Sequence, residues 1–168
     1  MKQLSIPQQR YSKRKVARTI SLRGANHITL KANAFILRKN HRVIKQLIHT
    51  TQIRYGMKLQ AVAIMGNHVH LLAKVRSRKS FADALRFLAS RIALSLGNGK
   101  LWNIRAWSRP VVYQRDLRHV TNYVVANPFA AKIYHSSVDS YCIQGGVLVD
   151  VPVFEEVERG SQVAFEFS

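Results

Sequence analysis

Two histidines separated by one residue are the first feature of the sequence that could carry chemistry. His68 and His70 flank Val69 in the run MGNHVHLL, residues 65–72. In a β-strand, side chains two residues apart project from the same face, about 7 Å apart along the chain. Two imidazoles placed in this way can share one metal ion. A strand that happens to carry two half-exposed histidines explains the pair equally well, so both interpretations stay open.

A tyrosine further along the chain is a candidate nucleophile. The helical pattern over residues 114–126 puts Tyr123 and Asn127 one turn apart on one face, with His119 one turn earlier. A phenoxide can attack phosphorus and hold the product covalently, and a nearby cation or basic side chain can activate it. A metal held by two neutral histidines and an amide oxygen would keep open positions for phosphate oxygens and water. For His119 we favour a solvated helix histidine over a residue that tunes Tyr123.

Hydrophobic periodicity predicts the elements that must position these residues. Alternating or short apolar runs predict strands, and apolar residues at helical spacing predict helices. Gly66-Asn67 suits a tight hairpin turn, Ser80 with Asp83 resembles a capping box, and Gly97 is a helix stop. The expected strands cover residues 27–34, 59–65 and 69–75, and the expected helices cover residues 40–56 and 80–96.

The connection after the second helix mixes aromatic and basic side chains: Trp102, Arg105, Trp107 and Arg109. Aromatic residues interleaved with arginines are typical of single-stranded nucleic-acid binding, where bases stack and phosphates are neutralised. A place in the core explains Trp102 at least as well. We expect a short edge strand at residues 111–113, because Pro110 precedes it and proline is confined to sheet edges.

The order of these elements predicts an α+β fold of the ferredoxin-like βαββαβ type. It has a four-stranded antiparallel sheet, followed by an additional helix that carries Tyr123. This last helix should stop near Asn127, because Pro128 disfavours helix for the residue before it. We divide the chain into a basic arm (residues 1–21), this domain (residues 22–135) and an acidic tail (residues 136–168).

The charge of the chain predicts a polyanionic partner. Its 168 residues include 27 Lys and Arg against 8 Asp and Glu, a formal net charge of +19. Residues 136–168 hold one Arg against six acidic residues, a net charge of −5, so residues 1–135 carry +24. An ordinary solvated surface mixes acidic with basic residues, whereas few acidic residues are interspersed among these cations. Nucleic acid is the leading candidate.

Other classes of protein fit the sequence poorly. No apolar run approaches the roughly 20 residues of a membrane span, and the first 20 residues lack the apolar core of a secretory signal. Cys142 is the only cysteine, which excludes a disulfide framework and a thiolate zinc cluster. We therefore expect a cytoplasmic protein that does not associate with membranes.

Three segments together resemble the IS200/IS605-type single-tyrosine transposases, most closely the REP-associated tyrosine transposases of that family. They are MGNHVHLL (65–72), LWNIRAWS (101–108) and, above all, NYVVANP (122–128). Each motif is short, but the three occur in the family's order within residues 23–135. Family members are HUH endonucleases, named for their histidine, hydrophobic, histidine motif, which His68-Val69-His70 matches.

The resemblance implies a metal-dependent enzyme that cleaves and rejoins single-stranded DNA beside hairpins. Tyr123 falls on the catalytic tyrosine, which would form a 5′-phosphotyrosine and release a 3′-hydroxyl. His68 and His70 would bind Mg²⁺ or Mn²⁺, and Asn127 falls on the helix position that contributes a third ligand. The enzyme would act as a monomer or a homodimer. We expect DNA contacts from Arg23, Lys31, Arg105 and Arg109.

The sequence departs from the family pattern at the first strand. The family often has Arg-Gly-Asn after the histidine and threonine of this strand, whereas Lys31-Ala32-Asn33 follow here. DNA contacts at this point are therefore expected to differ. Gly66 replaces a common proline, which a turn tolerates. A host-adopted relative that binds hairpin DNA or RNA without cutting it is the alternative, and a ribosome-associated or RNA-chaperone protein is a third.

Overall fold

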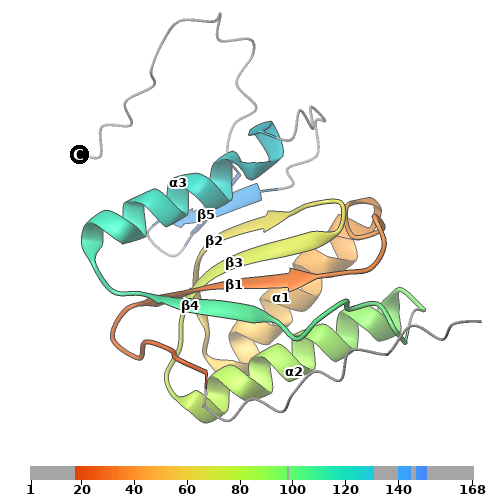
Figure 1. Cartoon of the computed structure of the whole chain (residues 1–168), viewed down its shortest axis with the longest axis horizontal. Coiled ribbons are helices and arrows are strands. Elements are labelled where there is room, and N and C mark those ends of the chain that lie inside the picture. The colour runs from red at the N-terminus through yellow and green to blue at the C-terminus, as the bar shows by residue number, and fades with distance from the viewer. Residues whose placement is uncertain (1–17, 98, 131–139, 145–146, 151–168) are drawn as a thin grey trace, which may run out of the picture.

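The computed structural model describes residues 18–97, 99–130, 140–144 and 147–150. Most of the predicted basic arm and much of the acidic tail therefore lie outside the described residues. The elements follow one another from β1 to β6 along the chain (Figure 1). They are β1 (Ala25–Lys31), the 3₁₀ helix η1 (Arg38–Asn40), α1 (His41–Tyr55), β2 (Lys58–Ile64), β3 (His68–Lys74), α2 (Arg78–Ser95), β4 (Trp107–Val111), α3 (Gln114–Ala130), β5 (Ser140–Gln144) and β6 (Val147–Asp150).

The strands form one antiparallel sheet in the order β4-β1-β3-β2-β5-β6. Its first four members have the ferredoxin-like order, and with α1 and α2 as crossovers they confirm the predicted α+β fold with a four-stranded antiparallel sheet. Two strands from the acidic tail extend this sheet beyond β2. The sequence did not lead us to expect them.

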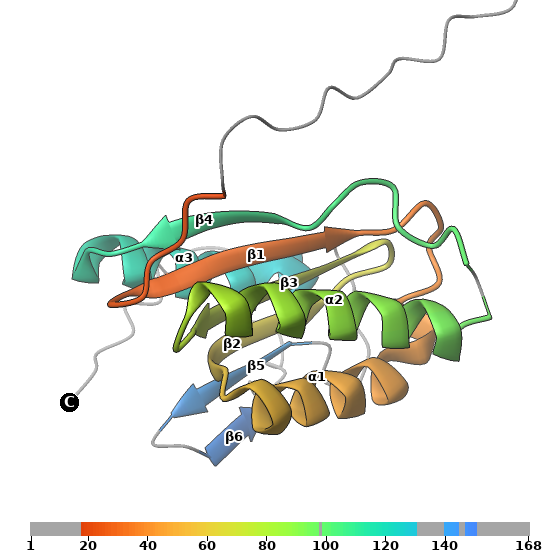
Figure 2. The same cartoon turned by 90° about the horizontal axis from the view of Figure 1, so that it is seen from below.

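Helices cover both faces of the sheet. Figure 2 shows α1 and α2 side by side on one face and α3 behind the sheet on the other. The larger core lies under α1 and α2, where Ile28, Leu71 and Leu88 are fully buried. A smaller core lies under α3, where Val120 and Val124 meet Leu72 of β3. The alternation of side chains along β1 and β3 thus supplies two packed faces, and α3 covers only part of the second one.

Two predicted boundaries are confirmed and give the local frame of the site. Helix α1 ends at Tyr55, and Gly56 follows with a φ of 62°, a left-handed conformation that glycine adopts without steric cost. The β2–β3 hairpin turns at Gly66-Asn67 and closes with the Met65 amide donating to the His68 carbonyl at 2.8 Å. This hairpin places both histidines of the motif at the start of β3.

The predicted edge strand begins four residues earlier, and ends two residues earlier, than expected. Strand β4 spans Trp107–Val111, and Val112 and Tyr113 lie beyond it as exposed residues. The register pairs Trp107 with Thr29 and Pro110 with Asn26. Because β4 is an edge strand in the described sheet, Pro110 can lie within it without disrupting a central ladder. The error came from taking Pro110 as a boundary.

The predicted start of α2 and the predicted end of α3 are both wrong. Helix α2 begins at Arg78, because the Ser77 hydroxyl accepts from the Ser80 amide at 3.0 Å and caps the helix one turn earlier than expected. Ser80 instead donates to the Tyr55 carbonyl at 2.6 Å. Helix α3 continues through Pro128 to Ala130. Packing of its apolar side against the sheet outweighs the single backbone donor that proline removes.

Trp102 takes the role of a core residue. It is half-buried against the α1/α2 core, and its indole Nε1 donates to the Ala89 carbonyl of α2 at 2.8 Å. Of the two interpretations for this tryptophan, the structure supports packing. None of the helices in the described part of the chain is both long and apolar enough to cross a membrane.

Candidate functional site

The register of three strands brings the polar residues of the sheet together on the face that carries α3. Thr29 of β1 lies between Trp107 of β4 and His70 of β3. Two residues away, His27 lies opposite Arg109 of β4. Side chains two apart on a strand share a face, so Thr29, His70, His27 and Arg109 lie on one side of the sheet, with Leu72 of β3 beside His27.

A cavity of about 420 Å³ opens where this side of the sheet meets α3. Strands β1, β3 and β4 supply its floor, and α3 supplies its wall. The lining consists of His27, Thr29, His70, Trp107, Arg109, His119, Val120 and Tyr123. Two of the predicted site residues, His70 and Tyr123, therefore meet here, although 53 positions separate them in the sequence. Predicted Arg109 joins them, as does His119.

His70 is the most constrained of these side chains. It is 5% exposed, and its Nδ1 lies 3.1 Å from Nε2 of His27 and 3.2 Å from Oγ1 of Thr29. Its Nε2 is buried and has no hydrogen-bond partner among the described residues. Burial, with smaller effects of His68 and His27, lowers the pKa of His70 to about 3. The ring is therefore a neutral imidazole with one nitrogen left unpaired.

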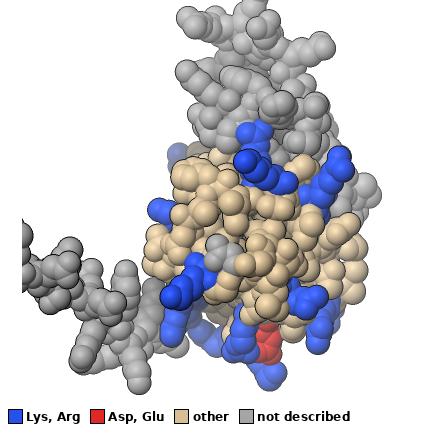
Figure 3. Space-filling model, turned by 90° about the vertical axis from the view of Figure 1, so that its right-hand side faces the viewer, with Lys and Arg blue, Asp and Glu red and all other residues tan. Residues whose placement is uncertain are grey.

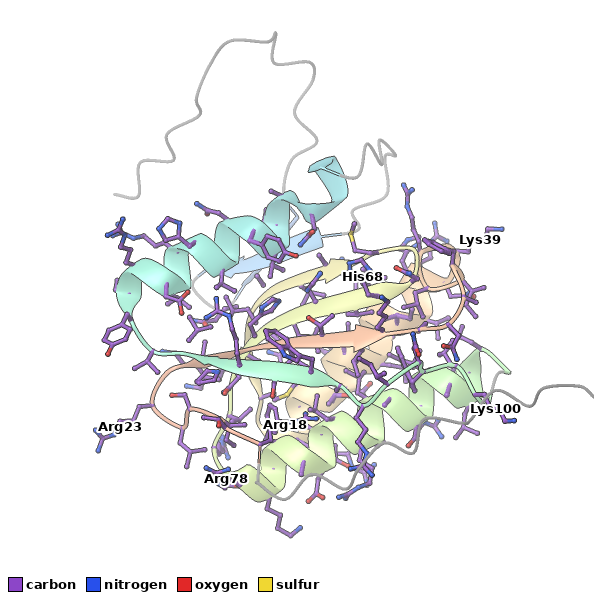
Figure 4. All side chains as sticks on the ribbon, in the orientation of Figure 1. Arg18, Arg23, Lys39, His68, Arg78 and Lys100 are labelled. Atoms are coloured by element: carbon purple, nitrogen blue, oxygen red, sulfur yellow. The ribbon has the colours of Figure 1, made fainter. Side chains whose placement is uncertain are left out.

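His68 presents a second neutral imidazole beside the first. Its ring centroid lies 4.8 Å from that of His70, with the two planes nearly perpendicular. Its Nδ1 lies 2.8 Å from Oδ1 of Asn67, which fixes the ring and leaves Nε2 for another partner. Burial first and Lys31 second lower the pKa of His68. Figure 4 shows His68 over the sheet, whereas Arg23 points away from it at the far edge of the molecule.

Tyr123 reaches the cavity from α3 and remains accessible. Its side chain is 52% exposed, and its ring centroid lies 5.6 Å from His70 and 6.0 Å from His27. Asn127, one turn later, is half-buried, and its Nδ2 donates to the Tyr123 carbonyl at 2.9 Å. Among the described residues, Asn127 makes no hydrogen bond to either histidine and does not line the cavity.

Sequence reasoning overlooked His27, which lies at the centre of the site. It is 6% exposed, stacks on His70 at 5.2 Å between centroids and meets the edge of Trp107 at 5.6 Å. Burial, followed by the charge of Arg109, lowers the pKa of His27 to about 4. Its position two residues before Thr29, on the polar side of an alternating strand, was the available signal. Without the register to β3 that signal could not be connected to His70.

The four basic residues predicted to bind DNA have different surroundings. Arg109 is held by Asp116 in a two-point ion pair, with Nη1 to Oδ2 at 2.9 Å and Nη2 to Oδ1 at 3.0 Å. This pair raises the pKa of Arg109 and lowers that of Asp116. Lys31 lies opposite His68 in the sheet. Arg23, Lys31 and Arg105 are exposed.

The donor chemistry of the two motif histidines fits a divalent metal. In each ring a neighbouring side chain lies within hydrogen-bond distance of Nδ1, a contact of the kind that orients metal-binding imidazoles, and burial disfavours the charged form of both rings. Within the described residues, no group of three or more His, Cys, Asp or Glu could hold a metal ion. A set completed by the Asn127 amide remains the prediction from the sequence.

Comparisons with known proteins agree with the fold and motifs. Residues 27–124 match the family model described as transposase IS200 like. A solved structure of a REP-associated tyrosine transposase bound to a REP hairpin is 16% identical over 73% of this chain and 76% of that chain, with a TM-score of 0.64. A candidate transposase from Deinococcus radiodurans R1 is 18% identical over 66% of this chain and 95% of that chain, with a TM-score of 0.45.

No curated protein matches the chain. The likeness to the hairpin-bound structure, at 16% identity, establishes a shared fold. The family model spans more than half of the chain and begins at His27, the first residue of the site. The resemblance drawn from the three motifs is thus confirmed at the level of the family: the chain belongs to the IS200-like transposases.

Proposed function

We propose that this protein is a metal-dependent single-stranded DNA endonuclease and strand transferase that acts beside DNA hairpins. One observation carries the proposal. An exposed tyrosine, Tyr123, shares a cavity with a buried neutral histidine, His70, whose Nε2 has no partner among the described residues. Transfer of a phosphate through a covalent intermediate needs a nucleophile, and a metal bound by a neighbouring imidazole can polarise that phosphate.

The reaction exchanges one phosphodiester bond for another. The Tyr123 oxygen attacks the phosphorus, the bond from phosphorus to the 3′ oxygen breaks, and that oxygen leaves with a proton as a free 3′-hydroxyl. The DNA downstream of the broken bond stays on the protein, with its 5′ phosphate joined to Tyr123 as a phosphotyrosine. A 3′-hydroxyl attacking this intermediate reseals the strand and returns the phenol. Because each step replaces one ester by another, no external energy source is needed.

The proton of Tyr123 needs an acceptor, and the cavity offers three imidazoles. His27 and His70 are buried, and burial gives both a strongly lowered pKa. His119 is exposed and precedes Tyr123 by one helical turn. An imidazole at this position can take the phenol proton and deliver one to the leaving oxygen. This proposal reverses the sequence-based preference for a merely solvated residue.

His68 and His70 would hold Mg²⁺ or Mn²⁺, with Asn127 as the third protein ligand. When bound, the metal would act as a Lewis acid on the phosphate. Arg109 borders the same cavity, and the Asp116 carboxylate orients its guanidinium. We propose that it contacts the scissile phosphate with the N–H groups that Asp116 does not use.

The excess of basic over acidic residues in the chain supports a nucleic-acid substrate. Lys31 and Arg105 are exposed, and Figure 3 shows Lys and Arg side chains spread over one side of the molecule with little acidic surface. Such a surface favours phosphate contacts without sequence preference. The similar solved structure is bound to a REP hairpin. We extend this to our chain and propose hairpin DNA as the substrate and the REP-associated branch as its place in the family.

The test is a covalent adduct. The protein is incubated with Mn²⁺ and a pool of labelled single-stranded oligonucleotides that carry a hairpin with randomised flanks. A denaturing gel should show a protein–DNA adduct that Tyr123→Phe abolishes. Tyr113→Phe is the matched control, because Tyr113 is 78% exposed just before α3 and does not line the cavity. An adduct that persists in Tyr123→Phe would overturn the assignment of the nucleophile.

The same assay separates the proposal from its alternative. His68→Ala should remove the adduct and leave much of the DNA affinity, because binding rests on phosphate contacts. Salt-sensitive binding by the unchanged protein, with no adduct in Mg²⁺ or Mn²⁺, would refute the proposed enzyme activity and favour a non-cleaving hairpin-binding protein. A preference for RNA in that experiment would select an RNA-binding role.

A further inference from the structure

The imidazole of His27, which was not among the predicted site residues, contacts three other aromatic rings of the site. It stacks on His70 with 27° between the planes and meets Trp107 and Tyr123 edge-on. Its Nε2 also lies 3.1 Å from Nδ1 of His70. Stacking and a hydrogen bond to the same neighbour restrict both the position and the rotation of the His70 ring.

The hydrogen bonds around His70 distinguish between its two neutral forms. A neutral imidazole has one N–H and one lone pair, and only the lone pair can bind a metal. The buried Nε2 has no partner among the described residues in either form, but proteins leave a buried N–H without an acceptor more rarely than they leave an acceptor without a donor, which disfavours the proton on Nε2. If Nδ1 carries it, Nε2 of His27 and Oγ1 of Thr29 both lie within reach as acceptors.

We propose that His27, assisted by Thr29, is a positioning residue that keeps the proton of His70 on Nδ1 and so leaves the buried Nε2 lone pair ready for the metal. The proposal rests on the metal site of the proposed function. His27 must then accept at Nε2 and carry its own proton on Nδ1. It touches neither the DNA nor the metal and acts through His70.

The tautomer of His70 can be measured directly in the unchanged protein. The chain is labelled with ¹⁵N-histidine, freed of metal with a chelator and studied near neutral pH. Long-range ¹H–¹⁵N correlations assign the protonated nitrogen, and His70→Gln identifies the signals of His70. We expect the proton on Nδ1. A proton on Nε2 of His70 would overturn the proposal, whatever the behaviour of the variants.

Variants test whether the nitrogen or the ring of His27 matters. His27→Phe keeps an aromatic ring for stacking and removes the nitrogen, whereas His27→Gln keeps a side-chain hydrogen-bonding group and removes the ring. Mn²⁺ binding is followed by the electron paramagnetic resonance signal of the free ion, in a Tyr123→Phe background. Loss of an outer-shell partner typically weakens metal binding 10- to 100-fold. We expect a loss in that range for His27→Phe and a smaller loss for His27→Gln.

Controls separate this proposal from the one on which it rests. His70→Ala should abolish specific Mn²⁺ binding, and Mn²⁺ binding that survives in His70→Ala would refute the metal site itself. If His70→Ala loses Mn²⁺ and His27→Phe binds it as well as the unchanged protein, only the role of His27 is refuted. Thr29→Val, which removes the second acceptor, should weaken Mn²⁺ binding further in the His27→Phe chain. Hairpin DNA affinity, measured in the same chains without metal, should fall much less than Mn²⁺ affinity, because DNA binding rests on phosphate contacts.

Discussion

Lowering the pH should destabilise the metal-free protein because two imidazoles are buried in neutral form. Burial lowers the pKa of His27 to about 4 and that of His70 to about 3, from an ordinary value of 6.5. Such groups favour the folded state above pH 6.5. Their contribution is lost as the pH falls from 6.5 toward the folded values, because the unfolded chain binds protons that the folded chain excludes.

The size of the effect follows from the two pKa values of each group. Between pH 7.5 and pH 5 an unfolded imidazole becomes almost fully protonated, while both folded ones remain largely neutral. Each then costs roughly 2 kcal/mol, so the pair lowers the free energy of unfolding by about 4 kcal/mol. Against a typical stability of about 5–15 kcal/mol, this is a large loss.

Urea unfolding at pH 7.5 and pH 5, with chelator present, measures this difference. In His27→Phe the loss should shrink to roughly 2 kcal/mol, because one titrating group is gone. His49→Gln, an exposed change on α1, is the matched control and should keep the full loss. Equal stability of the unchanged protein at the two pH values would refute the burial argument, as would an undiminished pH effect in His27→Phe.

Four further changes test other parts of the structure. Asp116→Ala removes the carboxylate that orients Arg109 and should lower the cleavage rate by about tenfold or more, with little change in unfolding midpoint, in the adduct assay. His119→Gln should slow adduct formation by about 100-fold or more; an unchanged rate would exclude His119 as the proton acceptor. Ile48→Ala truncates a fully buried side chain of α1 and should cost about 2–5 kcal/mol in urea unfolding while leaving the Mn²⁺ affinity unchanged. Gly56→Ala forces a left-handed conformation on alanine and should cost about 1–2 kcal/mol by the same method.

The fold was predictable where hydrophobic periodicity was strong. The pattern in α1, in the β2–β3 hairpin and in α2 gave element type and order, and the order gave the ferredoxin-like plan. The boundaries were less predictable because they depend on competition between neighbours. Ser77 and Ser80 are both adequate caps in sequence, and only the structure shows that Ser80 instead bonds to the Tyr55 carbonyl. Strands β5 and β6 escaped prediction because β5 pairs with β2, far away in the chain.

The site was predictable where chemistry follows from local spacing. His68 and His70 share a strand, and Tyr123 stands out on a helix face, so each motif could be recognised from a few residues. His27 and Trp107 belong to the site through strand register, which short-range patterns do not determine. The division into arm, domain and tail and the roles assigned to individual residues stay predictions.

The strong positive charge of the chain also influences the imidazoles of the site. Positive residues raise the local concentration of DNA, but nearby cations also disfavour protonation of a histidine. Arg109 lowers the pKa of His27, and Lys31 lowers that of His68. Each cation is paired with its histidine on the neighbouring strand, Arg109 with His27 and Lys31 with His68. The basic surface that we propose for DNA binding therefore also helps to keep the site imidazoles neutral, as metal binding requires.

Replacing Lys31 by Glu should then weaken DNA binding and raise the pKa of His68, whereas Lys31→Met should weaken DNA binding less and shift this pKa by a smaller amount. Histidine NMR titration of the metal-free protein measures both pKa shifts, and an identical His68 titration in the two variants would break this link between surface charge and site chemistry.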